Sequence, residues 1–433
     1  MGEIPAIRKN GLINHYVDLW RTYGDIVKFE TGPVKSYMVV GPEYVQHVML
    51  RNRDNYPKGR SHDKLREALG YGLLTSENPL WRTQRKLMQP TYTPNGIRKF
   101  ADVMVASAQQ MLEEWKDIPE GETIVVNDEM MKVAMRVISQ SMFGVDISKS
   151  FVDAGDALTY ILEYVSETGN NPLYPPTYIP TAKNRKFNKA LKTIDEFIYG
   201  IIDQRQGQEG GEDLLQMLMT AKDAETGEVM SRTQLRDEVL VTFFAGHETT
   251  ASLMGWAFYL LSLHPDVEAR FHSEIDAVLE GRSPTLDDID LLPYTRMIID
   301  ETLRLYSPVG VTARDTVEDD VIDGYAIEKG SLMLIFPYGS HRHPDFWEHP
   351  MAFYPEHFTE EAKANRPRYA YYPFGAGPRT CIGSHFALME AVLIMAEVGQ
   401  RYRLNFVPQP QIDTKFIGVM RPTRDIKMTL EKR

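Results

Sequence analysis

Apolar side chains recur every three or four residues along most of this chain, which is the spacing of helices that bury one face. Such stretches predict helices at Met111–Trp115, Met130–Phe143, Ala157–Val165 and Asn188–Arg205. The longest predicted helix runs from Thr233 to His264, about 48 Å at 1.5 Å per residue, and ends before a proline. Its middle is apolar over Val239–Ala245, so we expect this helix to pass through the centre of the molecule.

Strand signals are confined to two regions. Val27–Glu30 and Tyr37–Val40 flank a Thr-Gly-Pro turn and predict an early hairpin. Between residues 312 and 335, β-branched residues are interrupted by Asp323-Gly324 and Lys329-Gly330, which predicts short strands joined by turns.

Two polar or proline-rich segments interrupt the helical pattern. Asn170–Pro180 contains three proline pairs that break a helix, and Gln206–Glu212 is the most linker-like stretch. One short polar loop is weak evidence for a domain boundary. The expected fold is therefore mainly α-helical with small β-sheets, in a single domain over residues 1–433.

Composition and charge exclude several classes of function. The 433 residues include one cysteine, Cys381, so the chain cannot hold an internal disulfide or an all-cysteine metal cluster. The net charge of −12 opposes binding to nucleic acid. Neither a signal peptide nor an apolar run of about 18 residues is found, so we expect a soluble, cytoplasmic chain with no membrane span.

The single cysteine lies in a distinctive frame, Phe374-Gly375-Ala376-Gly377-Pro378-Arg379-Thr380-Cys381-Ile382-Gly383, directly before a helix predicted over Gly383–Val398. Backbone N–H groups at the start of that helix would stabilise a thiolate. The glycines let the backbone approach a planar ligand, and Arg379 could pair with a carboxylate on it. A lone cysteine is more often a small buried apolar residue, but this frame favours a ligand.

This frame, F-x-x-G-x-R-x-C-x-G, resembles the cytochrome P450 family of haem-thiolate monooxygenases. The resemblance implies a P450-type fold with α-rich and β-rich subdomains, and haem b bound between the long central helix and the cysteine loop. It also implies that the Cys381 sulfur is the axial ligand of the iron, with Phe374, Arg379 and Gly383 beside the cofactor.

A second matching motif, Ala245-Gly246-His247-Glu248-Thr249-Thr250, lies in the long predicted helix. Gly246 weakens the helix, and the Thr249 hydroxyl can bond the carbonyl one turn back, so a local opening is reasonable. The alternative without a catalytic role is that these polar side chains form hydrogen bonds within the helix. By resemblance, Ala245 lies against the haem, and Glu248 and Thr249 organise water and deliver protons to dioxygen.

A third motif, Glu301-x-x-Arg304, places opposite charges on one helix face. Such pairs are commonly solvated surface contacts, but the family buries this one to hold the segment that leads to the cysteine. The family's third member is an arginine, and here the corresponding residue is His357. A histidine offers no permanent charge, which leaves the strength and pH dependence of this network open.

Further basic residues are candidates for the haem propionates. Trp81 and Arg85 are four residues apart on one helix face, and a Trp–Arg stacking pair is the simpler alternative. The resemblance adds Arg314 to this group, beside Arg379. His62 is another candidate, although a polar loop position without a cofactor role is more common.

The implied substrate is a hydrophobic small molecule, because the candidate pocket residues are apolar: Leu73, Leu74, Phe243, Phe244, Val309, Val311 and Ile417. Each of them could equally belong to the core. The motifs favour a fatty acid, with terpenoid, steroid and polyketide substrates open. A peroxide-using or isomerising haem-thiolate enzyme and a haem carrier or gas sensor are alternatives that the Glu248–Thr249 pair disfavours.

The implied reaction consumes dioxygen and needs electrons from a second protein. Only 52 residues follow Cys381, so we expect a separate ferredoxin or flavodoxin with its reductase rather than a fused domain. Arg82 and Lys86 on the Trp81 helix are candidate docking residues, although solvated helix positions are the simpler description.

Overall fold

The computed structural model describes residues 3–144, 152–169, 174–205, 213–222, 227 and 229–433. The predicted loop at 206–212 and the first part of the predicted break at 170–180 lie outside these ranges. From Tyr174 to Pro180 the chain forms turns and irregular structure, so this part of the predicted break is confirmed.

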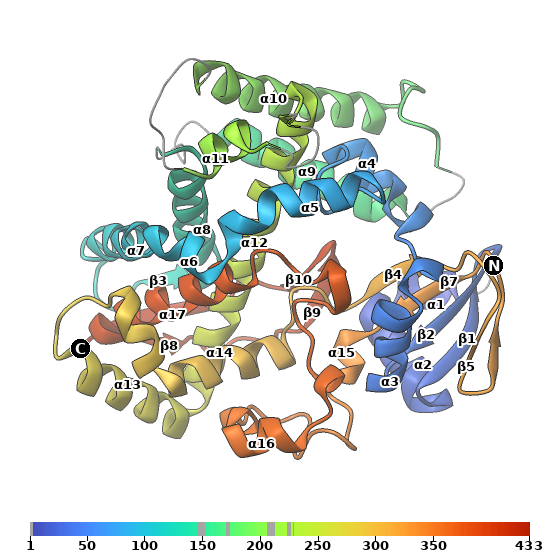
Figure 1. Ribbon diagram of the computed structural model, residues 1–433. Coiled ribbons are helices and arrows are strands. Elements are labelled where there is room, and N and C mark those ends of the chain that lie inside the picture. The colour runs from blue at the N-terminus through green and yellow to red at the C-terminus, as the bar shows by residue number, and fades with distance from the viewer. Residues whose placement is uncertain (1–2, 145–151, 170–173, 206–212, 223–226, 228) are drawn as a thin grey trace.

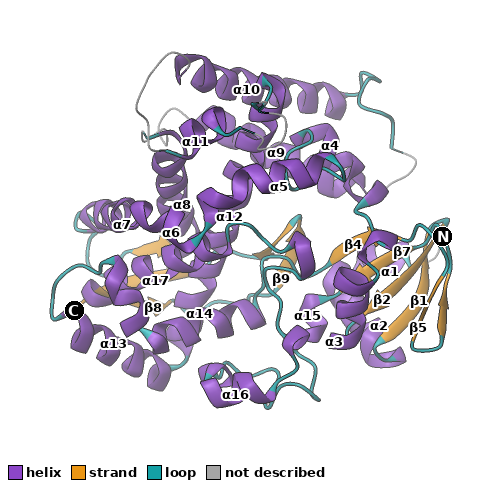
Figure 2. Ribbon diagram, viewed as in Figure 1, coloured by secondary structure: helices purple, strands orange, loops and turns teal. Residues whose placement is uncertain are grey.

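Helices dominate the described chain (Figure 2). The long ones are α7 (Ala101–Trp115), α8 (Val126–Phe143), α9 (Val152–Gly169), α10 (Ala182–Arg205), α12 (Arg232–Leu263), α13 (Pro265–Leu279), α14 (Pro293–Leu305) and α17 (Ser384–Arg401). The shorter ones are α1 (Ile4–Asn10), α2 (Leu12–Tyr23), α3 (Pro42–Gln46), α4 (Asp63–Leu69), α5 (Leu80–Met88), α6 (Pro94–Ile97), α11 (Leu214–Thr220), α15 (Pro337–Ser340) and α16 (Glu360–Asn365). Single turns include η1 (His47–Arg51), η3 (Gly59–His62), η4 (Gln89–Tyr92), η7 (Pro355–Phe358) and η9 (Gly377–Arg379).

The long helix α12 confirms the sequence prediction to within a residue at each end. The Ser231 hydroxyl accepts a hydrogen bond from the Gln234 N–H at 3.2 Å and caps the helix, which ends before His264-Pro265. Most of its residues are buried, and it runs through the middle of the molecule against α8, α14 and α17 (Figure 1). A helix buried on nearly all sides needs apolar residues around its whole circumference, as the sequence has.

Within the part of the chain that the structure describes, four small sheets accompany the helices. The largest has the strand order β1 (Ile26–Thr31), β2 (Val34–Val39), β7 (Leu332–Ile335), β4 (Thr312–Asp315), and lies at one side of the molecule (Figure 1). The others pair β5 (Asp320–Ile322) with β6 (Tyr325–Ile327), β9 (Thr414–Ile417) with β10 (Val419–Pro422), and β11 (Lys427–Lys432) with both β3 (Thr123–Val125) and β8 (Tyr402–Phe406).

The central strand β2 shows why the early hairpin forms. Tyr37 and Val39 pack into one apolar cluster, while Met38 and Val40 at the alternate positions pack into another, so both faces of the strand are buried. Gly32 has a φ of 63° at the hairpin turn, a conformation that glycine adopts without strain. The predicted hairpin and the strands predicted between 312 and 335 are therefore confirmed.

The helices share one large apolar core that extends from α4 to β11. It joins α7, α8, α12, α14 and α17, and so fixes the central helix relative to the cysteine segment that precedes α17. Within the described ranges, no helix is long and apolar enough to cross a membrane.

Candidate active site

The loop before α17 is closed by its own backbone. The Cys381 N–H donates to the Phe374 carbonyl at 2.8 Å, and the Thr380 N–H donates to the Gly377 carbonyl at 3.1 Å. Gly375 and Gly377 have φ of 77° and 68°, and a Cβ on Gly377 would lie 2.1 Å from the Met49 carbonyl oxygen. Glycine is therefore required at Gly377 both by the backbone conformation and by the close approach of η1.

The surroundings of Cys381 act on the pKa of its thiol in both directions. Its side chain keeps solvent-accessible surface, yet protein atoms surround it closely enough that burial raises the pKa of the thiol. The Gly383 N–H and the charge of Arg85 act in the opposite direction and favour the thiolate. A bound cation would add the missing stabilisation.

One face of α12 is accessible although the helix is central. Thr242, Ala245 and Thr249 follow at i, i+3 and i+7, which places them on one side, and the Ala245 side chain is exposed. The Thr249 hydroxyl donates to the Ala245 carbonyl at 2.7 Å, the bond that the sequence predicts. The helix nevertheless continues through this point without a break.

The second member of the predicted pair, Glu248, is directed elsewhere. Its carboxylate is 2% exposed and lies 2.5 Å from the Arg421 guanidinium, which reaches it from β10. Burial raises the pKa of Glu248, and Arg421 opposes this effect. The structure therefore places Glu248 beside Arg421, while the Thr249 hydroxyl bonds its own helix.

Trp81, Arg85 and Arg379 meet at the cysteine loop. The Arg379 guanidinium lies 4.1 Å from the centre of the Trp81 ring, and it also pairs with Glu77 at 2.5 Å and donates to the Ser76 carbonyl at 2.7 Å. Arg85 donates to the Thr380 carbonyl at 2.8 Å. Trp81 therefore stacks on an arginine, as the simpler alternative predicted. That arginine is Arg379 in the cysteine loop and not Arg85.

A buried cluster of cations lies beside Arg379. Arg314 is 7% exposed, and its hydrogen bonds go to two neutral acceptors, the Thr312 hydroxyl at 3.1 Å and the Ala313 carbonyl at 2.8 Å. Burial and the charge of Arg379 lower the pKa of Arg314 to about 10. Lys58 is equally buried, and burial, with Arg314 and Arg379 next, holds its pKa well below the ordinary value.

His62 lies at the same cluster, in η3. Burial lowers its pKa well below the ordinary value, and the charges of Lys58, Arg314 and Arg66 add to this effect. The sequence favoured a polar loop position for His62. The structure places that position beside Lys58 and Arg314. The proximity of Lys58 to Arg314 follows from the backbone, because the Asp315 N–H donates to the Pro57 carbonyl at 2.9 Å.

These residues fit a haem. Lys58 and Arg314 are buried and Arg379 is partly buried, and among the described residues Glu77 is the carboxylate that acts on all three. Gathering like charges away from water is costly, and two propionates on a porphyrin edge would help to balance them. Cys381 would provide the thiolate, and the accessible side of α12 around Ala245 would face the cofactor.

The Glu301 network is fully buried and supports the segment before the cysteine. Arg304 forms a bidentate pair with Glu301, with both N–O distances 2.7 Å, and donates to the carbonyls of His341, Pro350 and Ala352. His357 Nδ1 lies 3.2 Å from both Glu301 oxygens, so the predicted third member is in place.

A second arginine strengthens the position of His357. Arg366 donates to the His357 carbonyl at 2.9 Å, and its guanidinium lies 4.1 Å from the centre of the Trp347 ring. The ring nitrogens of His357 face the Glu301 carboxylate and the Glu348 carbonyl. The permanent positive charge that a histidine lacks is supplied near Glu301 by Arg366, which interacts favourably with that carboxylate.

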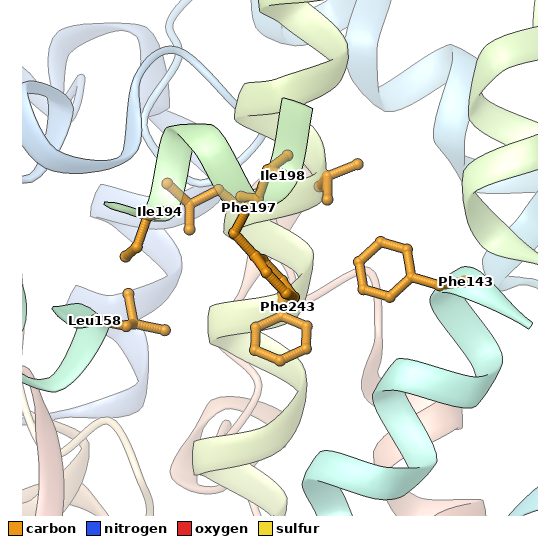
Figure 3. A pocket seen from close by; sticks show the side chains of 8 residues that line it. Phe143, Leu158, Ile194, Phe197, Ile198 and Phe243 are labelled. Atoms are coloured by element: carbon orange, nitrogen blue, oxygen red, sulfur yellow. The ribbon is translucent and has the colours of Figure 1, made fainter. Parts of the chain in front are cut away.

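The candidate pocket residues do not all lie on one side of α12. Phe243 is buried and points into a small apolar cavity between α8, α9, α10 and α12 (Figure 3). Ala245, two residues along the helix, lies about 200° around the axis and so faces away from this cavity. The cavity is lined by Phe143, Leu158, Ile194, Phe197, Ile198, Val239, Leu240 and Phe243. Phe243 is thus placed with the core rather than with Thr249.

The other pocket candidates come from separate elements. Leu73 and Leu74 follow α4, Phe244 is buried on α12, and Ile417 ends β9. Val309 is 39% exposed and Val311 is buried, both between α14 and β4. That these four segments form one pocket with Ala245 stays a prediction.

Sequence reasoning missed Lys58, Glu77, Glu238 and Arg421. Glu238 is fully buried, accepts a hydrogen bond from the Leu73 N–H at 2.9 Å, and burial raises its pKa to about 8. No local pattern marks Lys58, Glu77 or Arg421, since each acquires its role from a partner elsewhere in the chain. Glu238 directly precedes the apolar stretch Val239–Ala245, and this position is a weak local signal of a buried acid.

Comparison with known proteins agrees with this geometry. The family model described as Cytochrome P450 matches residues 1–430. Cyclooctat-9-en-7-ol 5-monooxygenase of Streptomyces melanosporofaciens is 33% identical over 94% of this chain and 89% of its own, and cyclooctatin synthase of the same organism is 34% identical over 90% and 85%.

The fold has a solved counterpart as well. The crystal structure of the cytochrome P450DA heme domain superposes with a TM-score of 0.88 at 27% identity, over 100% of this chain and 94% of that one. Haem with a cysteine thiolate on the iron is the cofactor of this family, and Cys381 is the one cysteine of this sequence. The chain therefore belongs to the cytochrome P450 family of haem-thiolate monooxygenases.

Proposed function

We propose that this cytochrome P450 monooxygenase oxidises a terpenoid, in preference to the fatty acid that the sequence motifs favour. The observation that carries the proposal is the similarity, over nearly the whole chain, to a cyclooctat-9-en-7-ol monooxygenase and to cyclooctatin synthase. The candidate pocket residues other than Phe243 are apolar, and a fatty-acid carboxylate would need a cationic partner there. Arg421, in the strand that pairs with the Ile417 strand, is engaged by Glu248.

The reaction places one oxygen atom of dioxygen in a C–H bond of the substrate. The second atom leaves as water, and two electrons and two protons are consumed. The haem, when bound, supplies the activation of dioxygen. Cys381 would hold the iron, with Phe374 and Gly383 bounding the ligand loop, while Arg314 and Arg379 would hold the propionates and Arg85 would keep the loop in place.

Two residues of α12 would handle protons. Thr249 Oγ1, bonded to the Ala245 carbonyl, is placed to hold a water on the accessible face. Glu248 would supply protons to it once its carboxylate is released from Arg421. Ala245, which has a small side chain, would leave room for the ligand.

The electron donor would be a separate ferredoxin or flavodoxin, with Arg82 and Lys86 on α5 as docking residues. Both are exposed on the helix that also carries Trp81 and Arg85, so they lie on the side of the cysteine loop. We also propose one haem domain over residues 1–433 and a cytoplasmic location.

A spectral binding screen tests the substrate class. Cyclic terpenoid hydrocarbons, their alcohols, saturated fatty acids and steroids are added to the oxidised holoenzyme, and displacement of the distal water is read from the Soret band. We expect a terpenoid to give the largest shift at the lowest concentration. Tighter binding of a fatty acid than of every terpenoid would overturn the proposal.

A further inference from the structure

The hairpin of β9 and β10 is attached to the central helix at its proposed acid. Arg421 in β10 places both its Nε and its Nη2 2.5 Å from Glu248 Oε1. The next contact is one turn along α12, where the Ser252 hydroxyl donates to the Met420 carbonyl at 3.0 Å. The hairpin is thus attached to α12 by one charge pair and one neutral hydrogen bond.

The other side of the hairpin meets the segment that carries Val309. The Met420 N–H donates to the Pro308 carbonyl at 2.8 Å, and a Cβ on Gly310 would lie 3.1 Å from the Met420 sulfur. The turn between the two strands holds the pocket candidate Ile417 and Gly418, whose φ is 74°. A ligand that touches this turn therefore pushes on the strand that carries Arg421.

Arg421 is the charged group that acts on Glu248 among the described residues. Burial raises the pKa of Glu248, and the Coulombic attraction and hydrogen bond of Arg421 are the opposing effects. The neighbouring His247 is buried, bonds the Phe243 carbonyl at 2.7 Å, and has a pKa lowered to about 4, so it is neutral at pH 7. The protonation state of Glu248 thus depends on one side chain of the hairpin, Arg421.

We propose that Arg421 is a positioning residue for proton delivery, holding the Glu248 carboxylate on the hairpin until ligand contact at the Ile417 turn loosens the pair. Glu248 and Thr249 are adjacent in sequence but about 100° apart around the helix, so the carboxylate must turn toward Thr249 to serve it. A movement of the β9–β10 hairpin would release the Glu248 carboxylate from Arg421 and so allow it to turn. This inference rests on the proposed role of Glu248 and not on the terpenoid assignment.

The test compares Arg421→Gln, Arg421→Lys and a matched control. The control is Arg403→Gln, because Arg403 in β8 pairs at 2.6 Å with Glu268, a buried acid on α13, outside the candidate site. The first readout uses no turnover: infrared titration of the oxidised holoenzyme, with the Glu248 carboxyl band assigned by Glu248→Gln. We expect Arg421→Gln to raise the titration midpoint by about one pH unit or more, and Arg421→Lys to restore most of it.

The second readout is the fraction of reducing equivalents lost as hydrogen peroxide, measured with a surrogate ferredoxin system. The added ligand is the compound with the largest shift in the binding screen, whether terpenoid or fatty acid, so failure of the substrate proposal leaves this test intact. We expect Arg421→Gln to increase peroxide several-fold, Arg421→Lys less, and Arg403→Gln not at all. In a Glu248→Gln background the Arg421→Gln change should add nothing.

Two results would overturn the proposal. One is an unchanged Glu248 midpoint in Arg421→Gln, which would mean that the pair does not set the state of the acid. The other is a shifted midpoint with unchanged peroxide, which would make Arg421 a structural clamp. Should Arg421→Gln fail to fold, Arg421→Lys decides: wild-type values in both readouts support a charge role, and peroxide at the Glu248→Gln level contradicts it.

Discussion

Three basic side chains, the buried Lys58 and Arg314 and the partly buried Arg379, lie close to one another and to the Glu77 carboxylate. Two of them were predictable, because Arg379 precedes the cysteine and Arg314 follows the Glu301 helix at the family's spacing. Lys58 was not, since its place depends on the backbone pairing of Pro57 with Asp315. The cost of burying such a group explains why the cluster needs an anionic ligand.

At this scale the first prediction concerns retention of the haem. Arg314→Met keeps the side-chain volume and removes the charge, so the propionate that Arg314 is proposed to hold would lose a charge-assisted hydrogen bond of about 1.5–3 kcal/mol. We expect haem to leave the variant roughly ten- to hundredfold faster, measured by transfer to an excess of apomyoglobin. Arg232→Gln, which breaks the exposed pair with Asp203, serves as the control and should retain haem normally.

A second prediction concerns the pH dependence of stability. Burial raises the pKa of Glu238 to about 8, so between the unfolded value and pH 8 the folded protein binds the extra proton. Its contribution to stability is full below pH 4 and is lost as the pH rises to 8. Glu238→Gln keeps an acceptor for the Leu73 N–H and carries no proton, so it removes this loss, on the order of a few kcal/mol.

Thermal unfolding at a series of pH values checks the Glu238 prediction. The melting temperature of Glu238→Gln relative to the parent should rise steadily from pH 5 to pH 8 and then level off. Glu360→Gln is the comparison that should lack this rise, because Glu360 is exposed and Lys363 lowers its pKa. A constant difference between parent and Glu238→Gln across the range would contradict the prediction.

Among the elements, the cysteine loop shows how glycine placement fixes a ligand. Both Gly375 and Gly377 have positive φ, but only Gly377 also touches another segment, at the Met49 carbonyl of η1. The sequence indicated that glycines bring the backbone close to a ligand, whereas the structure shows that Gly377 brings it close to η1. The local sequence pattern indicates that glycine adopts a special backbone conformation here. It does not indicate which neighbouring segment of the fold requires that glycine.

The two glycines give a matched prediction at this scale. Gly375→Ala places a Cβ in open space, so it should cost about 1 kcal/mol of stability through backbone strain alone. Gly377→Ala adds a Cβ 2.1 Å from a backbone oxygen, so the loop must shift and thiolate ligation should weaken. Chemical denaturation measures the first effect, and the reduced carbon monoxide spectrum measures the second. Equal spectra and equal stabilities would contradict this assignment.

The molecule as a whole combines a net charge of −12 with local basic surface on α5. Arg82 and Lys86 are exposed there, and an acidic electron donor would be attracted to them over short distances. The fold places this surface near the cysteine loop, because Arg85 on the same helix donates to the Thr380 carbonyl.

Reduction kinetics test the docking surface. The Arg82→Glu, Lys86→Glu double variant should be reduced more slowly by a ferredoxin at low ionic strength, with the difference shrinking as salt screens the charges. Lys189→Glu, Lys192→Glu on α10 makes the same change in net charge at another exposed place and should be reduced normally. Equal rates for the two double variants would reject α5 as the docking site.

The sequence by itself determined the long central helix, the early hairpin and the ligand loop, because apolar periodicity, turn residues and short motifs are local properties of the chain. It also determined the charge pair of Glu301 and Arg304, which are one helical turn apart. The tertiary structure decided which distant groups share a site: Lys58 with Arg314, Glu248 with Arg421, Arg366 with the Glu301 network, and Phe243 with the core. Burial and pairing across hundreds of residues arise only when the chain packs, and burial is what turns these ordinary side chains into groups with shifted charge and function.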